Sequence, residues 1–357
     1  MKRIRVLIVE DSKVIRQFLE YIIGRDPRLE IAGAVETAEE ALRILASSSP
    51  DVISMDIRLP GMNGFEATQW IMRERPTPIV VVSASVERED LKITMNALRA
   101  GALTVLEKPS GVTSDDYEAL AERLCTQLAI MSQVKVVRRH GEARARPTAI
   151  QRSAPPDAGY RALGIVSSTG GPSALVQVLG RLGPDFPLPI LLVQHITGSF
   201  LEGFAAWLET VCPFPVEIVE GRVVPARAKV YLSTRDHHLR AETGYIRADP
   251  GDPVCAQRPS GTVLFESMAK AYGSQALGVL LTGMGDDGAQ GMLQLHRGGG
   301  YTIAEDESTA VVYGMPAEAV RLGAVAESLA LPAIAPRIMQ LIMAGKEAVE
   351  WNYSPRF

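Results

Sequence analysis

Three carboxylates, a serine and a lysine in the first third of the chain stand at the ends of short apolar runs: Glu10, Asp11, Asp56, Ser83 and Lys108. Carboxylates packed together repel one another, and Mg²⁺ relieves this repulsion while keeping waters and phosphate oxygens around it. The metal and the lysine would offset charge on a transferred phosphoryl group as an aspartate attacks it. This set predicts phosphoryl transfer to Asp56, with Ser83 donating a hydrogen bond to the resulting acyl phosphate.

A serine, a histidine and an aspartate follow in that order in the second half: Ser168, His195 and Asp287. A serine hydroxyl is a poor nucleophile until a base takes its proton, and that base needs an orienting carboxylate. Ser168 lies in Ser167–Pro172 (SSTGGP), whose glycines permit a tight turn and whose proline suits the first turn of a helix. Amides at a helix N-terminus favour a developing oxyanion. The pattern predicts acyl transfer.

Each of these motifs also has a purely structural interpretation. Ser-Thr-Gly-Gly before a helix is typical of an N-cap or a phosphate-binding loop, and an aspartate after a strand often caps a helix or turn. The segment lacks both the Gly-x-Ser-x-Gly of common α/β-hydrolases and the lysine of a P-loop. A single histidine is more often a hydrogen-bonded core residue than a base. The order of the three residues, all at strand ends, favours catalysis.

The elements that must position these residues follow from the apolar pattern. Short β-branched runs alternate with stretches of helical spacing, which predicts doubly wound parallel sheets. In the first part the expected strands are Ile4–Val9, Ile31–Val35, Val52–Met55, Ile79–Val82 and Leu103–Leu106, and the expected helices are Val14–Ile23, Ala38–Ser47 and Asp115–Met131. Open α/β sheets carry functional groups at the carboxyl ends of their strands, so the first set of residues should converge there.

The same alternation restarts at residue 162 and predicts a second, mostly parallel sheet. The expected strands are Ala162–Val166, Ile190–Gln194, Val216–Val219, Lys229–Leu232, Ala276–Leu281 and Tyr301–Ala304. The expected helices are Gly171–Leu182, Phe200–Val211, Val263–Ala271, Gly288–Arg297 and Met315–Arg321, and Tyr245–Ala248 suggests a small hairpin. Between the two sheets, from about Ser132 to Gly159, apolar periodicity is replaced by basic residues and then by proline, serine and glycine, which indicates a linker. The linker contains a basic cluster, Lys135, Arg138, Arg139, Arg144 and Arg146. This cluster is either a binding patch or a solvated part of the linker, and we favour the second interpretation.

Composition excludes several classes of function. The chain has 357 residues, 46% hydrophobic and 22% charged, which is typical of soluble globular domains. A formal net charge of −4 gives no basic field for nucleic acid. The three cysteines lie far apart, which favours reduced thiols over disulfides or a metal site. The N-terminal apolar run is too short for a signal peptide, and no segment approaches the roughly 18 apolar residues of a membrane span, so we expect a cytoplasmic protein.

The first part resembles the response-regulator receiver family over about residues 1–125. The motifs are Val9–Ser12 (VEDS), Met55–Gly64 (MDIRLPGMNG), Val82–Ala84 (VSA) and Glu107–Pro109 (EKP). This resemblance implies a five-stranded flavodoxin-like domain in which Glu10, Asp11 and Asp56 hold Mg²⁺. It also implies that Asp56 takes a phosphoryl group from a histidine kinase and that Ser83 and Lys108 sense it. The chain departs from the family at Val105, where receivers usually carry an aromatic switch residue.

The second part resembles the chemotaxis protein-glutamate methylesterase family over about residues 160–345. The shared motifs are SSTGGP, VQH, QRPS, LTGMGDDGA and DESTAVVYGMP. The resemblance implies that Ser168 is the nucleophile, His195 the general base and Asp287 the orienting acid, with Thr169 and the N–H of Met284 stabilising the oxyanion. The substrates it implies are methyl-accepting chemotaxis receptors, whose glutamate methyl esters are hydrolysed and some of whose glutamines are deamidated, with no cofactor.

Departures from this second family fall close to the expected site. Ser167 stands where alanine is usual, Asp286 where asparagine is usual, and Ile196–Ser199 replaces a stretch containing Met and Pro. The last of these borders the site and therefore bears on the choice of substrate.

The whole chain is similar to the two-domain arrangement of these enzymes. The expected parts are a receiver (1–125), a helix end and linker (126–159), a methylesterase domain (160–347) and a tail (348–357). The linker would allow the receiver to cover the esterase site until phosphorylation shifts the population towards an open state. The alternatives are a non-catalytic, phosphorylation-dependent binding module and a related esterase acting on a non-chemotaxis receptor. A DNA-binding regulator is disfavoured by the charge and by the α/β pattern.

Overall fold

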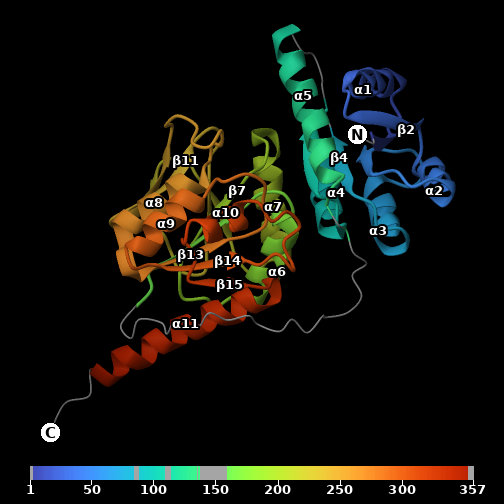
Figure 1. Cartoon of the computed structure of the whole chain (residues 1–357). Coiled ribbons are helices and arrows are strands. Elements are labelled where there is room, and N and C mark those ends of the chain that lie inside the picture. The colour runs from blue at the N-terminus through green and yellow to red at the C-terminus, as the bar shows by residue number, and fades with distance from the viewer. Residues whose placement is uncertain (1–2, 84–87, 109–113, 135, 137–158, 353–357) are drawn as a thin grey trace. The chain divides into compact units, whose positions relative to one another are not determined.

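The computed structural model describes residues 3–83, 88–108, 114–134, 136 and 159–352, arranged in two compact units, Met1–Ala143 and Arg144–Phe357 (Figure 1). The basic cluster expected in the linker lies outside the described residues. The three cysteines are free thiols. Among the described helices, none combines the length and the apolar composition that a bilayer-spanning helix needs.

A five-stranded sheet in the order β2-β1-β3-β4-β5, with all its strands parallel, forms the centre of the first unit. Its strands are β1 (Ile4–Val9), β2 (Leu29–Val35), β3 (Val52–Met55), β4 (Ile79–Ser83) and β5 (Thr104–Glu107). Its helices are α1 (Lys13–Arg25), α2 (Ala38–Ser47), α3 (Gly64–Glu74), α4 (Arg88–Ala100) and α5 (Ser114–Met131). This strand order is that of flavodoxin-like folds, so the predicted fold class is confirmed.

Local sequence explains how the loop after β3 is held. β3 is buried along its whole length, as expected for a parallel strand covered on both faces. Helix α3, an addition to the expected helices, begins with a capping box in which Asn63 and Glu66 bond each other's backbone N–H groups. A Cβ atom on Gly64 would lie 2.1 Å from the carbonyl oxygen of Asp56. Glycine therefore lets α3 begin directly against the backbone of Asp56.

A seven-stranded sheet in the order β15-β14-β13-β6-β7-β10-β8 forms the centre of the second unit, and all its strand pairs are parallel. Its strands are β6 (Ala162–Ser167), β7 (Ile190–Gln194), β8 (Val216–Val219), β10 (Val230–Ser233), β13 (Ala276–Leu280), β14 (Tyr301–Glu305) and β15 (Glu327–Leu329). A separate antiparallel sheet contains β9 (Arg222–Val223), β11 (His238–Glu242) and β12 (Tyr245–Asp249). The predicted hairpin is confirmed as β11–β12.

Helices complete the second unit and pack closely on its sheet. They are α6 (Gly171–Leu182), α7 (Leu201–Val211), α8 (Gly261–Tyr272), α9 (Ala289–Arg297), α10 (Met315–Arg321) and α11 (Leu331–Asn352), with short 3₁₀ turns η1 (Gly198–Phe200) and η2 (Gly273–Gln275). A Cβ on Gly164 of β6 would lie 2.4 Å from the sulfur of Met268, so glycine permits the close packing of α8 on β6.

The strand order also fixes where a site can form. Strand β6 has β7 on one side and β13 on the other. The strands that follow β6 in the chain are first added to the sheet on the β7 side, and the later strands β13, β14 and β15 are added on the opposite side. Such a switch point opens a crevice at the carboxyl ends of the central strands, where α/β proteins bind ligands. Ser168, His195 and Asp287 all follow these central strands.

Candidate functional site

Ser168 and His195 occupy equivalent positions at the ends of neighbouring strands. The register of β6 and β7 ends with the pair Ser167↔Gln194, so the next residue on each strand is Ser168 and His195. The backbone N–H of His195 donates to the carbonyl oxygen of Ser167 at 3.0 Å. The parallel pairing therefore brings the candidate nucleophile and the candidate base to the same edge of the sheet.

Two adjacent serines end β6, and their environments differ. The hydroxyl of Ser167 is fully buried and donates to Oε1 of Gln194 at 2.7 Å. Ser168 is partly exposed at the carboxyl edge of the sheet. Substrate can reach the second hydroxyl and not the first, which supports the choice of Ser168 made from the sequence.

Gln194 links the serine and histidine segments, a role that was not predicted. Its Nε2 donates to the carbonyl oxygens of Ser168 at 2.9 Å and of His195 at 3.0 Å. A Cβ on Gly171 would lie 2.1 Å from Oε1 of Gln194, so glycine makes room for this buried amide. A glutamine has no titratable group, and the only sequence signal is its place beside His195 in the VQH motif.

His195 and Asp287 form a hydrogen-bonded pair, with Nε2 of His195 2.8 Å from Oδ2 of Asp287. The carboxylate of Asp287 is buried and accepts three further bonds at the N-terminus of α8. These come from Oγ of Ser260 at 2.6 Å, the N–H of Gly261 at 2.6 Å and the N–H of Thr262 at 3.1 Å. Asp287 therefore satisfies helix amides, as the structural interpretation proposes, and also orients the histidine.

These contacts decide the charge of Asp287. Burial alone would raise the pKa of its carboxyl group, but hydrogen bonds from His195, Ser260 and Gly261, with the charge of His195, outweigh that effect and hold the pKa below its ordinary value. The carboxylate thus stays ionised and fixes the imidazole through Nε2. Nδ1 is then the ring nitrogen left to act as a base.

The segment that carries Met284 approaches the serine closely because of a glycine. A Cβ on Gly283 would lie 2.8 Å from Cβ of Ser168. The N–H of Ser168 donates to the carbonyl oxygen of Thr282 at 3.0 Å, which joins the two segments directly. Thr169 is buried and the side chain of Met284 is 43% exposed. The two proposed oxyanion residues therefore lie on the two backbone segments that meet at Ser168.

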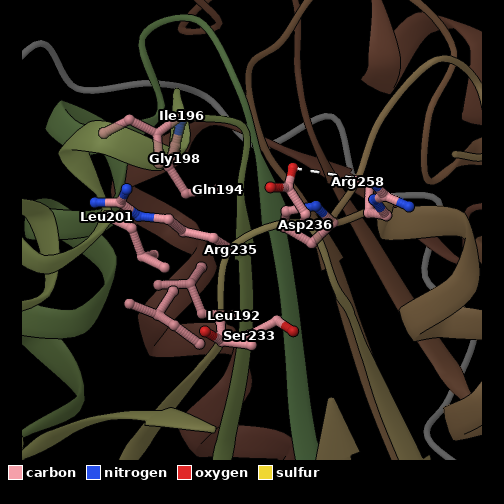
Figure 2. A pocket seen from close by; sticks show the side chains of 12 residues that line it. Leu192, Gln194, Ile196, Gly198, Leu201, Ser233, Arg235, Asp236 and Arg258 are labelled. Carbon is pink, nitrogen blue, oxygen red and sulfur yellow. Dashed lines mark ion pairs between the residues drawn. The ribbon is translucent and has the colours of Figure 1, made fainter. Parts of the chain in front are cut away.

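A cleft is lined by Gln194 and Ile196, the residues directly before and after His195 in the chain (Figure 2). Its lining comes from the end of β7, from η1 and the start of α7, from the end of β10, and from the segment before α8: Leu192, Gln194, Ile196, Gly198, Leu201, Leu232, Ser233, Thr234, Arg235, Asp236, Arg258 and Pro259. Figure 2 shows Arg258 and Asp236 on one side, joined by an ion pair of 4.0 Å, and Arg235 on the other. The loop after His195 that departs from the family thus forms one wall of this cleft.

In the first unit, a lysine joins two buried carboxylates at the carboxyl edge of the sheet. Nζ of Lys108 lies 2.7 Å from Oδ2 of Asp56 and 2.9 Å from the carboxylate of Glu10. Oxygen atoms of Glu10, Asp11 and Asp56 lie within 4.8 Å of one another. Lys108 also donates its backbone N–H to the carbonyl oxygen of Ser83 at 3.0 Å. The structure therefore brings together the side chains of the three carboxylates and of Lys108, and it places the backbone of Ser83 beside Lys108.

The electrostatics of this cluster fit a divalent cation. Burial, and then the charge of Asp56, raise the pKa of Glu10 to about 7, although Lys108 opposes the shift. Burial also raises the pKa of Asp56, with Lys108 again opposing it. A cation held by Glu10, Asp11 and Asp56 would favour their ionised forms, and a set of carboxylate oxygens is the donor set that Mg²⁺ prefers. Val105, in place of the usual aromatic residue, is buried in β5.

Comparisons with known proteins identify what each part of the chain is similar to. The CheB methylesterase family model matches residues 163–338, and the response regulator receiver domain model matches residues 6–121. A Paramagnetospirillum magneticum protein named protein-glutamate methylesterase/protein-glutamine glutaminase 2 is 54% identical over 97% of this chain and 99% of its own length. A Myxococcus xanthus protein, numbered 4 under the same name, is 44% identical over 94% of this chain and 96% of its own. The solved methylesterase catalytic domain of Thermotoga maritima CheB is 32% identical, with a TM-score of 0.49, over 51% of this chain and 98% of that domain.

Proposed function

Because this chain belongs to the protein-glutamate methylesterase/protein-glutamine glutaminase family, we propose that it hydrolyses glutamate methyl esters on methyl-accepting chemotaxis receptors. It also deamidates certain receptor glutamines, and it works in the cytoplasm, where a chemotaxis histidine kinase supplies the phosphoryl group for Asp56. The observation that carries this proposal is the His195–Asp287 pair at the edge of the sheet beside the partly exposed Ser168. We expect the protein neither to bind nucleic acid nor to insert into a membrane.

The reaction proceeds through an acyl-enzyme. Nδ1 of His195 takes the proton of the Ser168 hydroxyl while the oxygen attacks the ester carbonyl, and Asp287 stabilises the imidazolium. The N–H of Met284 and Thr169 stabilise the tetrahedral oxyanion. His195 then protonates the leaving methoxide, and methanol departs. Water, deprotonated by His195, attacks the acyl-enzyme and releases free glutamate and Ser168; with a glutamine substrate the leaving group is ammonia.

We propose that the cleft lined by Gln194 and Ile196 holds the part of the receptor that flanks the scissile ester. Its floor is apolar, from Leu192 and Leu232, and its walls carry the guanidinium groups of Arg235 and Arg258. An apolar floor with polar groups on the walls suits an aliphatic ester chain presented by a polar protein surface.

Asp287→Asn is expected to lower kcat for methanol release by about 10³- to 10⁴-fold, because an amide does not hold the imidazole tautomer that leaves Nδ1 free as a base. Asp286→Asn is the matched control, since Asp286 is the exposed neighbour at a position where the family usually has asparagine. We expect this control to stay within about threefold of the parent, because its side chain forms no part of the proposed triad. Steady-state methanol release from methylated receptor measures both. A loss of activity in the control equal to that of Asp287→Asn would contradict the assignment.

The receiver controls this activity. When Mg²⁺ is bound by Glu10, Asp11 and Asp56, it supplies charge stabilisation for phosphoryl transfer to Asp56. Lys108 keeps one oxygen of Asp56 oriented and offsets the phosphoryl charge, and Ser83 donates a hydrogen bond to the product. Domain order and the proline-containing linker support a receiver that covers the esterase until it is phosphorylated.

Removing residues 1–155 is expected to raise basal methylesterase activity severalfold, because the covering receiver is absent and every esterase site is open. The activity of the truncated protein should also be independent of a small-molecule phosphodonor, because the phosphate acceptor Asp56 has been removed. Methanol release from the truncated and full-length proteins, at equal concentration of enzyme titrated with a serine-reactive probe, measures the effect. Unchanged or lower basal activity would show that simple covering is wrong.

The test of the whole proposal is methanol release from methylated receptor, with and without acetyl phosphate and Mg²⁺. We expect release in both conditions and faster release with the phosphodonor. A protein that labels with a serine-reactive probe but releases no methanol would point to the alternative of an esterase for another substrate. A protein that does neither would support the binding-module alternative.

A further inference from the structure

A fully buried glutamate lies one strand away from the proposed triad and has no part in the mechanism above. Glu305 ends β14, and its side chain is 0% exposed. The backbone pairing of β13 and β14 ends at Leu280↔Ala304. Beyond that pair, Oε2 of Glu305 accepts the backbone N–H of Thr282 at 2.9 Å. The carboxyl group thus extends the sheet by one hydrogen bond, at the point where the two strands have stopped pairing.

Thr282 connects this carboxyl group to the site. Its carbonyl oxygen accepts the N–H of Ser168 at 3.0 Å, and its hydroxyl donates to the carbonyl oxygen of Thr169 at 2.9 Å. The same hydroxyl accepts the N–H of Val312 at 2.9 Å. Thr282 is itself fully buried and directly precedes Gly283, which lies against Ser168. One residue therefore fixes the backbone on both sides of the candidate nucleophile.

A carboxyl group at this position is costly. Burial, with a contribution from the charge of Asp306, raises the pKa of Glu305 to about 7, although the N–H of Thr282 and the side chain of Thr309 oppose the shift. A leucine would fill the same space without that cost but would leave the N–H of Thr282 without its acceptor. The placement is accounted for by the bond that Glu305 makes rather than by packing.

We propose that Glu305 is a positioning residue of the esterase: it accepts the N–H of Thr282 and so holds the segment that places Ser168 and the oxyanion donors. This inference rests on the proposed function, because it assigns a role within that site. The essential property is a hydrogen-bond acceptor of the right length, so glutamine should replace glutamate, whereas aspartate, shorter by one methylene, should not.

The test compares Glu305→Gln, Glu305→Asp and Glu305→Ala in the full-length chain. We expect alanine and aspartate to lower kcat for methanol release, and the rate at which a fluorophosphonate probe labels Ser168, by about 10- to 100-fold, as misplacement of reacting groups does. KM should stay within about twofold, since the cleft lined by Gln194 and Ile196 is untouched. Glutamine should stay within about threefold of the parent in both rates, because its amide oxygen still accepts the bond. If the alanine variant does not fold, the aspartate and glutamine variants alone decide the matter.

Glu327→Ala is the matched control for burial of an acid in the same sheet. Glu327 is 4% exposed on β15, and it accepts bonds from the Tyr301 hydroxyl at 2.6 Å and from Arg337 at 2.7 Å, away from the catalytic segments. We expect this control to lower Tm without lowering kcat. Parent-like kcat and labelling in Glu305→Asp, or equal losses in the Glu305 and Glu327 variants, would overturn the proposal, as would a glutamine variant as slow as aspartate. If the parent releases no methanol, the proposed function fails, and the labelling rates of Ser168 still decide the role of Glu305.

Discussion

Replacing Ser168 with alanine is expected to lower methanol release by at least about 10³-fold, because the reaction loses the oxygen that forms the acyl-enzyme. The residual rate would be what the oxyanion donors and the cleft support with water as the nucleophile. Phosphorylation of Asp56 should be unchanged, since that cluster belongs to the first compact unit and Ser168 to the second. The measurements are methanol release from methylated receptor and incorporation of phosphate from acetyl phosphate.

Ser167→Ala is the matched control for that substitution. The hydroxyl of Ser167 is buried and bonds Gln194, and the family usually has alanine at this position. We expect kcat to fall by no more than about tenfold, because Nε2 of Gln194 keeps its bonds to the carbonyl oxygens of Ser168 and His195. If Ser168→Ala kept parental activity while Ser167→Ala lost it, the assignment of the nucleophile would be wrong.

The second unit shows which parts of a fold are readable from sequence. Strand β7 (Ile190–Gln194) and helix α6 (Gly171–Leu182) have the predicted bounds, because each has an uninterrupted apolar pattern and a clear punctuating residue. Strand β15 (Glu327–Leu329) was not predicted, since three residues carry too little periodicity. Helix α11 was not predicted either, and it holds Pro336 in its interior, which normally argues against a helix.

Some contacts of the candidate site could also be predicted from the sequence, and others could not. The resemblance to the methylesterase family predicted that Asp287 orients His195, and in the structure Nε2 of His195 lies 2.8 Å from Oδ2 of Asp287. The catalytic roles of these residues remain predictions. The supporting contacts were not predictable, because Gln194, Ser260 and Glu305 act through neutral or backbone hydrogen bonds to residues distant in sequence. No spacing rule identifies a glutamine or a buried glutamate as the acceptor or donor that fixes a loop.

The same limit applies to the cleft. Its lining residues come from four separate segments, and only the loop after His195 was expected to border the site. Arg235 and Arg258 are 23 positions apart and face the cleft only because β10 and the segment before α8 end on the same edge of the molecule. Tertiary topology, rather than local pattern, determines which charges a substrate meets.

Asp56→Asn is expected to abolish phosphorylation by acetyl phosphate and to remove all stimulation of methanol release, because an amide cannot form the acyl phosphate. Basal esterase activity should persist, since the substitution leaves Ser168, His195 and Asp287 intact. The variant should still fold, because asparagine has nearly the shape of the buried aspartate and Lys108 keeps its ion pair with Glu10 at 2.9 Å. The ratio of methanol release with and without phosphodonor, at fixed Mg²⁺, measures the loss of control.

Asp51→Asn is the matched control for Asp56, because Asp51 is an acid of the same unit whose carboxylate accepts the backbone N–H of Arg5 at 2.8 Å and lies outside the cluster. It should keep both phosphorylation and stimulation. Lys108 explains why the control and the variant must differ: its ammonium group bonds Asp56 at 2.7 Å and Glu10 at 2.9 Å, so a phosphoryl group on Asp56 changes a buried charge network that Asp51 does not touch. Stimulation that survives in Asp56→Asn would mean that the phosphodonor acts elsewhere. Phosphorylation without stimulation in the parent protein would instead locate the failure in the coupling, where Val105 replaces the usual aromatic residue.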